Sequence, residues 1–203
     1  MSHPYPPPRD KKGSRIGFTT GANAAAAAKA AALALLGEAP EVVDIWLPAG
    51  WRQPFRVFRL ERKGDGVLVG MIKDAGDDPD VTHGAEIQAF VRFASEDRLE
   101  GGEGVGVVTK PGLGVPVGEP AINPVPRRMI WEAVREVTER PLAVTIAIPG
   151  RRTSAYLSMR RWCDTLGFEP KVALRPFDEI LPAVQRGEFE AGLNDAIDAV
   201  DAL

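Results

Sequence analysis

The sequence has few residues that bind metals or form disulfides. Cys163 is its only cysteine, which excludes an internal disulfide and any zinc site with two thiolates. Its two histidines, His3 and His83, leave little for a histidine metal cluster, so we expect no protein-bound metal. Aromatic residues make up only 7% of the chain, so the core must be built mostly from Ala, Val, Leu and Ile.

Long apolar runs and an excess of basic residues are also missing. No run approaches the ~18 apolar residues of a membrane span, and the N-terminal residues lack the apolar stretch of a signal peptide. The net charge is −3 and the pI is near 5.5, whereas a nucleic-acid binder usually shows a basic excess or a basic stripe. We therefore expect a cytoplasmic protein that binds neither membranes nor nucleic acid.

The 203 residues suffice for one or two domains with a real core. The chain is 44% apolar and 26% charged, as is ordinary for a globular protein. A chain of this size buries about 70% of its unfolded surface. Gly and Pro are abundant, at 21 and 18 residues, which indicates many turns and special backbone positions.

Segments of distinct composition predict the order of the elements. Residues 1–14 are predicted to be a disordered arm, because their prolines and basic residues keep them extended and solvated. The run ANAAAAAKAAALALLG predicts a helix, with Thr20 or Asn23 as its cap and Gly37 after its end. A second, amphipathic helix is predicted at residues 126–139, and strands are predicted at residues 42–47, 55–60, 67–72, 87–93, 105–109 and 142–148.

These elements predict an α+β fold. In a domain of residues 15–149, a mixed sheet packs with the alanine-rich helix and with the second amphipathic helix. A small α/β tail follows at residues 150–203, with helices near residues 153–166 and 177–185 and a strand at residues 171–174.

An acidic segment, KDAGDDPDVTHG at residues 73–84, is the first candidate for a functional site. Its closely spaced carboxylates repel one another unless cations or backbone donors meet them. A calcium loop is excluded, because His83 stands at the position of its glycine and Ala89 at the position of its glutamate. Two interpretations stay open: a polar site for donor groups of a ligand, or a turn that bonds its own backbone. The carboxylates are those of Asp74, Asp77, Asp78 and Asp80.

The glycine-rich segment at residues 101–128 is the second candidate. Val107 stands where a dinucleotide fingerprint needs its third glycine, and a strand pattern follows where that fingerprint needs a helix. What remains is a loop whose amides can approach a ligand, with Lys110 just beyond it. The glycines of this loop are Gly102, Gly104 and Gly106.

Single residues elsewhere offer further candidate contacts, each with a structural alternative. His83 is a general base or a hydrogen-bonded structural residue. Asn123, in AINPVPRR, is a fixed recognition residue or part of a proline-rich connector. Thr19, Thr20 and Gly21 bind an anion at the start of the first helix or simply cap it.

Four long segments in one order carry a resemblance that none carries alone. RIGFTTGANAAAAAKAAALALL, KDAGDDPDVTHG, GGEGVGVVTKPGL and GEPAINPVPRRMI resemble the cobalt-precorrin-5B C(1)-methyltransferase family of the anaerobic cobalamin pathway, over about residues 13–148. The resemblance implies C1 methylation of cobalt-precorrin-5B to cobalt-precorrin-6A. S-adenosylmethionine would be the methyl donor and a ring-contracted tetrapyrrole, which brings its own cobalt, the acceptor.

Site roles follow as expectations from this resemblance. Basic side chains would pair with substrate carboxylates, and the acidic segment would meet the sulfonium or the amino group of the donor. The alternative is a non-catalytic tetrapyrrole-binding module; a homo-oligomer is compatible with either. The expected catalytic residues are Asp77, Asp78 and His83. The expected binding residues are Thr19, Thr20, Gly21, Lys73, Asp74, Asp80, Thr82, Gly102, Gly104, Gly106, Lys110, Asn123 and Arg127.

The sequence departs from this family in two places. Members often have Cys, Ser or Thr where Asn23 stands here, and they run past 300 residues into a glycine-rich second domain. The tail is instead similar to a fragment of 1,4-dihydroxy-6-naphthoate synthase over about residues 145–193, on PGRRTSAYLSMRRW and RPFDEILPAVQRGEFEAGL. A junction of two families near residue 149 is therefore expected, and an enzyme of the menaquinone pathway is a third interpretation.

Overall fold

The computed structural model describes residues 9, 13–80, 82–112, 114–149, 163, 166–167 and 184–188. Most of the arm predicted at residues 1–14, and most residues of the elements predicted for the tail, lie outside these residues. No helix in the described part of the chain is long and apolar enough to cross a membrane.

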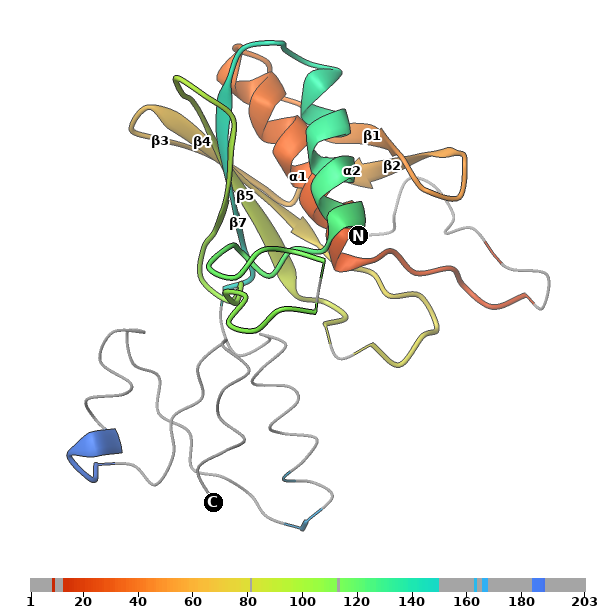
Figure 1. Cartoon of the computed structure of the whole chain (residues 1–203). Helices are drawn as coiled ribbons and strands as arrows, with labels where there is room; N and C mark the ends of the chain where they lie inside the picture. The colour runs from red at the N-terminus through yellow and green to blue at the C-terminus, as the bar shows by residue number, and fades with distance from the viewer. Residues whose placement is uncertain are drawn as a thin grey trace.

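A five-stranded mixed sheet forms the centre of the fold (Figure 1). Neighbouring strands run antiparallel, except that β6 and β7 are parallel. The mixed α+β architecture is as predicted. The strand order is β3-β4-β5-β7-β6, with bounds Arg59–Lys63 for β3, Gly66–Ile72 for β4, Glu86–Phe93 for β5, Arg98–Gly101 for β6 and Leu142–Ala147 for β7.

The alanine-rich helix α1, Thr20–Leu35, lies between the sheet and the second helix (Figure 1). Its alanine side chains are thin, so β4 and β5 approach it on one side and α2 on the other, and nearly all of its residues are buried. The Thr19 hydroxyl accepts a hydrogen bond from the Ala22 amide at 3.1 Å, so the cap lies one residue before the predicted Thr20. The helix ends at Leu35, shortly before Gly37, as predicted.

The second helix, α2, Pro124–Arg135, packs on α1 rather than directly on the sheet centre. Its buried face consists of Met129, Ile130, Ala133 and Val134. It begins two residues earlier than predicted because Pro124 fits the first helical turn, and it ends at Arg135 instead of Glu139. The two helices begin at the same end of the molecule (Figure 1).

One predicted strand is divided between two sheets. The run predicted as a strand at residues 55–60 is split into the end of β2, Arg52–Arg56, and the start of β3. Strand β2 pairs with β1, Val42–Trp46, in a separate hairpin. The split occurs because the Val57 amide bonds Glu41 of the hairpin side, whereas the Phe58 amide bonds Gly70 of β4.

The strand predicted at residues 105–109 is wrong. This segment is a loop with an isolated bridge between Val107 and Pro120: the Val105 amide closes a turn on Gly102, and the Val108 amide bonds the Glu119 carbonyl. The edge strand is β6, four residues earlier in the chain. Its sequence RLEG has one large apolar residue, so the hydrophobic pattern did not reveal it.

Candidate functional site

The predicted segments converge at one end of the fold, the helix-start end, where α1 and α2 begin (Figure 1). The β4–β5 connection at residues 73–85, here the acidic loop, lies at this end. So does the β6–α2 connection at residues 102–123, here the glycine loop. The parallel strands β6 and β7 also finish here, and ligands of α/β folds commonly bind beyond the carboxyl ends of parallel strands.

The acidic loop is fastened to the chain just before α1. Arg15 donates to the Asp74 carboxylate at 2.6 Å, and the Arg15 amide donates to Asp77 at 2.8 Å. A Cβ on Gly17 would lie 2.0 Å from the carbonyl carbon of Ala75, so only glycine permits this approach of the two backbones. Two of the four carboxylates therefore meet donors, as an electrostatic argument requires.

An ion pair between a buried lysine and a half-buried aspartate stabilises the far side of the acidic loop. Lys73, whose side chain is 3% exposed, donates to Asp80 and to the Thr82 hydroxyl. Asp80 also accepts from the amide and the hydroxyl of Thr82, at 2.8 and 2.6 Å. Burial raises the pKa of Asp80, but these hydrogen bonds from Lys73 and Thr82 outweigh it and bring the pKa down to about 2. Lys73, Asp80 and Thr82 thus hold the loop in shape.

Two members of the predicted catalytic set lie where solvent and ligands reach them. Asp78 is exposed, and its carboxylate meets no side-chain partner within the described part of the chain. The Nδ1 atom of His83 accepts from the Ala75 amide at 3.1 Å and lies 3.8 Å from an Asp74 oxygen. With Nδ1 bonded to the backbone, the neutral ring carries its proton on Nε2. The Nδ1 atom of His83 is therefore engaged by the backbone of the acidic loop.

The glycine loop is held against the end of β7. The Gly102 amide donates to the Ile146 carbonyl at 2.7 Å, and the Gly106 carbonyl accepts from Ala121 at 2.7 Å. The Gly102 amide is thus used within the fold and is not offered to a ligand. Gly104 occupies the tight turn between these contacts, and Lys110 lies exposed further along the loop.

The start of α2 is fixed by an arginine. Arg127 donates to the backbone carbonyls of Ile122 and Pro120 at 2.8 and 2.9 Å, and its guanidinium lies 3.3 Å from Glu119. Asn123 occupies the N-cap position, but its side chain makes no capping hydrogen bond and is exposed. Arg127 therefore has a structural role, whereas the Asn123 amide is not used for capping.

The first turn of α1 lies beside the first turn of α2. The distance from a Cβ on Gly21 to the Pro126 Cγ atom would be 2.8 Å, so the helices touch here. The Thr19 hydroxyl is used for capping, which is the ordinary structural interpretation of this segment. Thr20 follows as the first helical residue.

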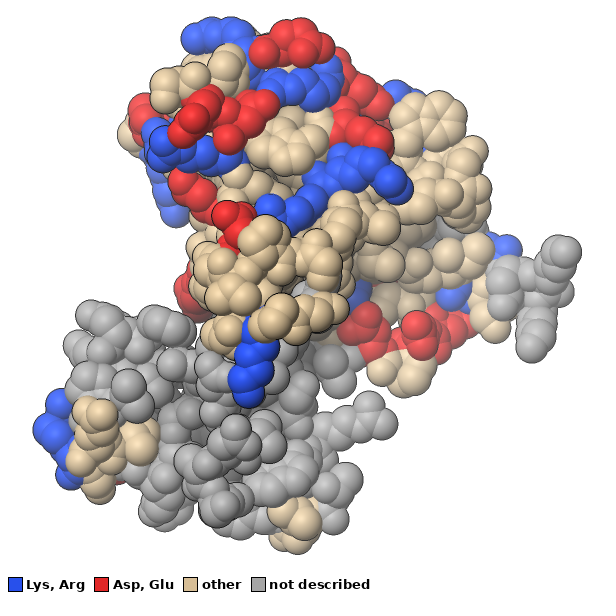
Figure 2. All heavy atoms as spheres, viewed as in Figure 1, with Lys and Arg blue, Asp and Glu red and all other residues tan. Residues whose placement is uncertain are grey.

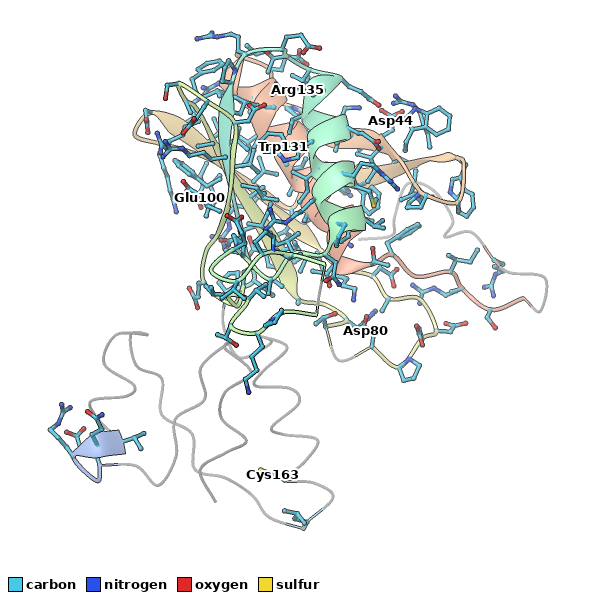
Figure 3. All side chains as sticks on the ribbon, in the orientation of Figure 1. Asp44, Asp80, Glu100, Trp131, Arg135 and Cys163 are labelled. Carbon is cyan, nitrogen blue, oxygen red and sulfur yellow. The ribbon has the colours of Figure 1, made fainter. Side chains whose placement is uncertain are left out.

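Two cavities border these segments. The first, of about 740 Å³, lies between β6 and α2 and includes Arg127. Trp131 and Arg135, which are labelled in Figure 3, also line it. The second, of about 550 Å³, lies between β2, the start of α1 and the acidic loop and includes Asp74. Of the predicted site residues, Arg127 lines the first and Asp74 the second. The four segments that resemble the family thus meet at the helix-start end, but neither cavity is lined by all four of them.

The sequence did not single out the residues that give these cavities their chemistry. Asn23 and Gln53 line the second cavity, and Trp131 the first. A polar residue inside an alanine-rich helix was a usable signal for Asn23. No periodicity marks Gln53, because it lies in a short strand with proline at its centre.

The surface charges and the grouping of metal-binding side chains limit what the site can bind. On the face drawn in Figure 2, acidic and basic side chains are intermixed over the end opposite the acidic loop, with no basic stripe. Within the described residues, no three of His, Cys, Asp and Glu are grouped to hold a metal ion.

Comparison with known proteins decides the family. The CbiD family model matches residues 7–162, which is most of the chain. The chain belongs to the CbiD family. A crystal structure of the CbiD cobalamin biosynthesis protein from Archaeoglobus fulgidus superposes with a TM-score of 0.54 at 27% identity, covering 80% of this chain and 52% of that one.

Curated CbiD relatives carry the name cobalt-precorrin-5B C(1)-methyltransferase. That of Salinispora tropica is 53% identical over 75% of this chain and 42% of its own length. That of Dechloromonas aromatica is 44% identical over 94% of this chain and 51% of its own length. This CbiD chain therefore spans about half the length of the relatives it matches, and the second alignment extends well past residue 149.

Proposed function

We propose that this CbiD-family chain takes part in cobalamin biosynthesis as a C-methyltransferase that converts cobalt-precorrin-5B to cobalt-precorrin-6A in the cytoplasm. The observation that carries the proposal is its identity of 53% to a relative named for this activity, over 75% of the chain. The geometry supports it, because a fixed acidic loop, exposed polar groups and the second cavity occur at the helix-start end, and the first cavity runs from this end along α2.

The first cavity has features that suit a flat polycarboxylate such as a tetrapyrrole. Trp131 offers an aromatic surface, and Arg127 and Arg135 precede and follow it by one helical turn on α2. Guanidinium groups are favourable partners for carboxylates. Both arginines already meet acidic residues, Glu119 and Asp97, so substrate carboxylates would compete with those pairs. Lys110 and Asn123 lie on the adjoining loop.

The second cavity and the acidic loop suit the methyl donor. S-adenosylmethionine would supply a methyl group on a positively charged sulfur. The carboxylates of Asp77 and Asp78 lie exposed on the acidic loop, whose Asp74 lines this cavity, and provide a negative field for a cation. His83 and Asp74 orient the same loop. Methyl transfer to carbon is an in-line displacement, so these residues would act mainly by positioning and by charge.

A turnover assay tests this function. The full chain is incubated with cobalt-precorrin-5B and methyl-labelled S-adenosylmethionine, and label in the corrinoid is measured. We expect label at C1 of the product, whereas label recovery equal to a protein-free reaction would refute the activity.

A second candidate is a non-catalytic tetrapyrrole-binding module. It is favoured by the first cavity, whose Trp131 ring and two arginines can bind a polycarboxylate without a donor site. Calorimetry separates the two candidates, because the module binds corrinoid but gives no heat with S-adenosylmethionine at millimolar concentration. The likeness of the tail to 1,4-dihydroxy-6-naphthoate synthase stays a prediction, as does a homo-oligomer.

A further inference from the structure

We propose that the second cavity, here the hairpin cavity, is the site that binds the adenosyl part of the methyl donor. This inference rests on the proposed function and adds where the donor lies. The hairpin cavity is bounded by β2 and the residues after it, by the start of α1 and by Asp74 of the acidic loop. Its volume, about 550 Å³, is within the range of small-molecule sites.

Two buried amides line the hairpin cavity with unsatisfied oxygens. Asn23 is 1% exposed, and its Nδ2 donates to the Thr19 carbonyl at 2.9 Å. Gln53 is 7% exposed, and its Nε2 donates to the Pro54 carbonyl at 3.1 Å. Neither amide oxygen has a donor within the described part of the chain. Because buried polar groups are normally hydrogen-bonded, these two acceptors indicate a missing donor, such as an exocyclic amine or a ribose hydroxyl.

The hairpin cavity also has aromatic walls. Phe18 and Phe55 meet edge to face, with ring centroids 5.2 Å apart, and both line it. Phe58 lines it too and is 60% exposed, which is unusual for a large apolar side chain. A planar heteroaromatic ring that donates hydrogen bonds matches this combination of apolar walls and acceptors. Adenine has this chemistry.

An arginine at the cavity could pair with the carboxylate of a nucleoside that carries an amino-acid group. Arg56 is exposed, lines the cavity and forms no ion pair with any described residue. Asp74, which belongs to the acidic loop, also lines the cavity. A carboxylate on the ligand would therefore meet Arg56, while its cationic groups lie toward the acidic loop.

Calorimetry on the full chain tests the placement with two probes, S-adenosylhomocysteine and adenosine. Gln53→Met keeps the side-chain length but removes the acceptor, so we expect about tenfold weaker binding of both probes. Arg56→Gln removes only the carboxylate partner, so S-adenosylhomocysteine binds about tenfold more weakly and adenosine is unchanged. Gln88→Met is the matched control, because Gln88 does not line the hairpin cavity and its amide bonds Glu86; we expect no change.

Each outcome separates the inference from the proposed function. If the wild-type chain binds S-adenosylhomocysteine and Gln53→Met binds it equally well, water satisfies the two amides and the hairpin cavity is not the site, although the methyltransferase function stands. If Gln53→Met fails to fold, Asn23→Ser replaces it, and unchanged affinity in that variant overturns the placement. If the wild-type chain binds neither probe and transfers no methyl group, both proposals fall.

Discussion

The carboxylates of the acidic loop differ in what they touch, and this difference separates their roles. Asp80 is paired with buried Lys73, and Asp74 with Arg15, so both hold the loop in place. Asp77 accepts one backbone hydrogen bond and is otherwise exposed, and Asp78 is exposed. Asp77 and Asp78 pair with no cationic side chain of the described residues, so their negative charge is available to a ligand.

We predict that replacing Asp77 and Asp78 together by Asn reduces methylation at least tenfold while the chain stays folded. The amide oxygen that replaces the Asp77 carboxylate still accepts from the Arg15 amide, so the change removes charge rather than shape. Initial rates with labelled donor measure the effect. Asp65→Asn, in the exposed β3–β4 turn, is the matched control and keeps the wild-type rate. Unchanged turnover in the double variant would remove both residues from the site.

We predict that Asp80→Asn lowers the free energy of unfolding by about 2 kcal/mol at pH 7, because the buried Lys73 ammonium loses its charged partner. The pKa of Asp80 is lowered to about 2 in the folded state, so its stabilising effect is complete above its ordinary pKa of 3.8. That effect is lost as the pH falls from about 4 toward 2. Urea unfolding of both proteins should therefore show a difference that shrinks over this interval; a constant difference would contradict the assignment.

At the scale of elements, close approach of backbones sets the geometry of the helix-start end. Gly21 on α1 and Pro126 on α2 touch, and Gly17 lies against Ala75 of the acidic loop. Together these contacts bring three chain segments, far apart in sequence, to one place. Any side chain at either glycine would separate elements that line the candidate site.

We predict that Gly21→Ala destabilises the protein by about 1 kcal/mol, although alanine favours a helix over glycine by a similar amount. The new Cβ would lie 2.8 Å from the ring of Pro126, which cannot yield as a flexible side chain does. Chemical denaturation measures the loss. Adding Pro126→Ala to the Gly21→Ala chain should recover part of the lost stability. A double-mutant cycle that shows no favourable coupling between the two substitutions would mean that the helices do not meet here.

The sequence predicted elements where local patterns are strong and missed them where tertiary pairing decides. Alanine content and β-branched runs specified α1, β1, β4, β5 and β7. In contrast, β6 exists because β7 lies beside it in parallel, and RLEG alone carries too few apolar residues to show this. The site follows the same division: the acidic loop was visible in the sequence, whereas the cavity around Asn23 and Gln53 depends on how distant segments pack.

At the scale of the whole molecule, a polar cluster adds to the apolar core in joining the β1–β2 hairpin to both helices. Lys29 of α1 donates to Glu136 at 2.6 Å, just after α2, and to the Asp44 carbonyl of β1 at 2.6 Å. Arg52 of β2 bridges Asp44 and Glu136 at 2.7 Å each (Figure 3 labels Asp44). This cluster connects the β1–β2 hairpin to both helices. Since the hairpin supplies one wall of the hairpin cavity, the cluster also fixes that wall.

We predict that the stability of the folded chain is nearly constant between pH 7 and 5 and falls as the pH drops below about 4.5. Hydrogen bonds from Arg52 and Arg135 lower the pKa values of Asp44 and Asp97, respectively. Burial raises the pKa of Glu136, but hydrogen bonds from Lys29 and Arg52 outweigh it and the pKa is lowered. A carboxylate with a lowered folded pKa stabilises the protein above its unfolded pKa and loses that effect when protonated. Urea unfolding from pH 7 to 3 measures the decline in stability, which Asp97→Asn should make shallower. Stability that stays constant or rises toward pH 3 would mean that these ion pairs do not stabilise the folded chain.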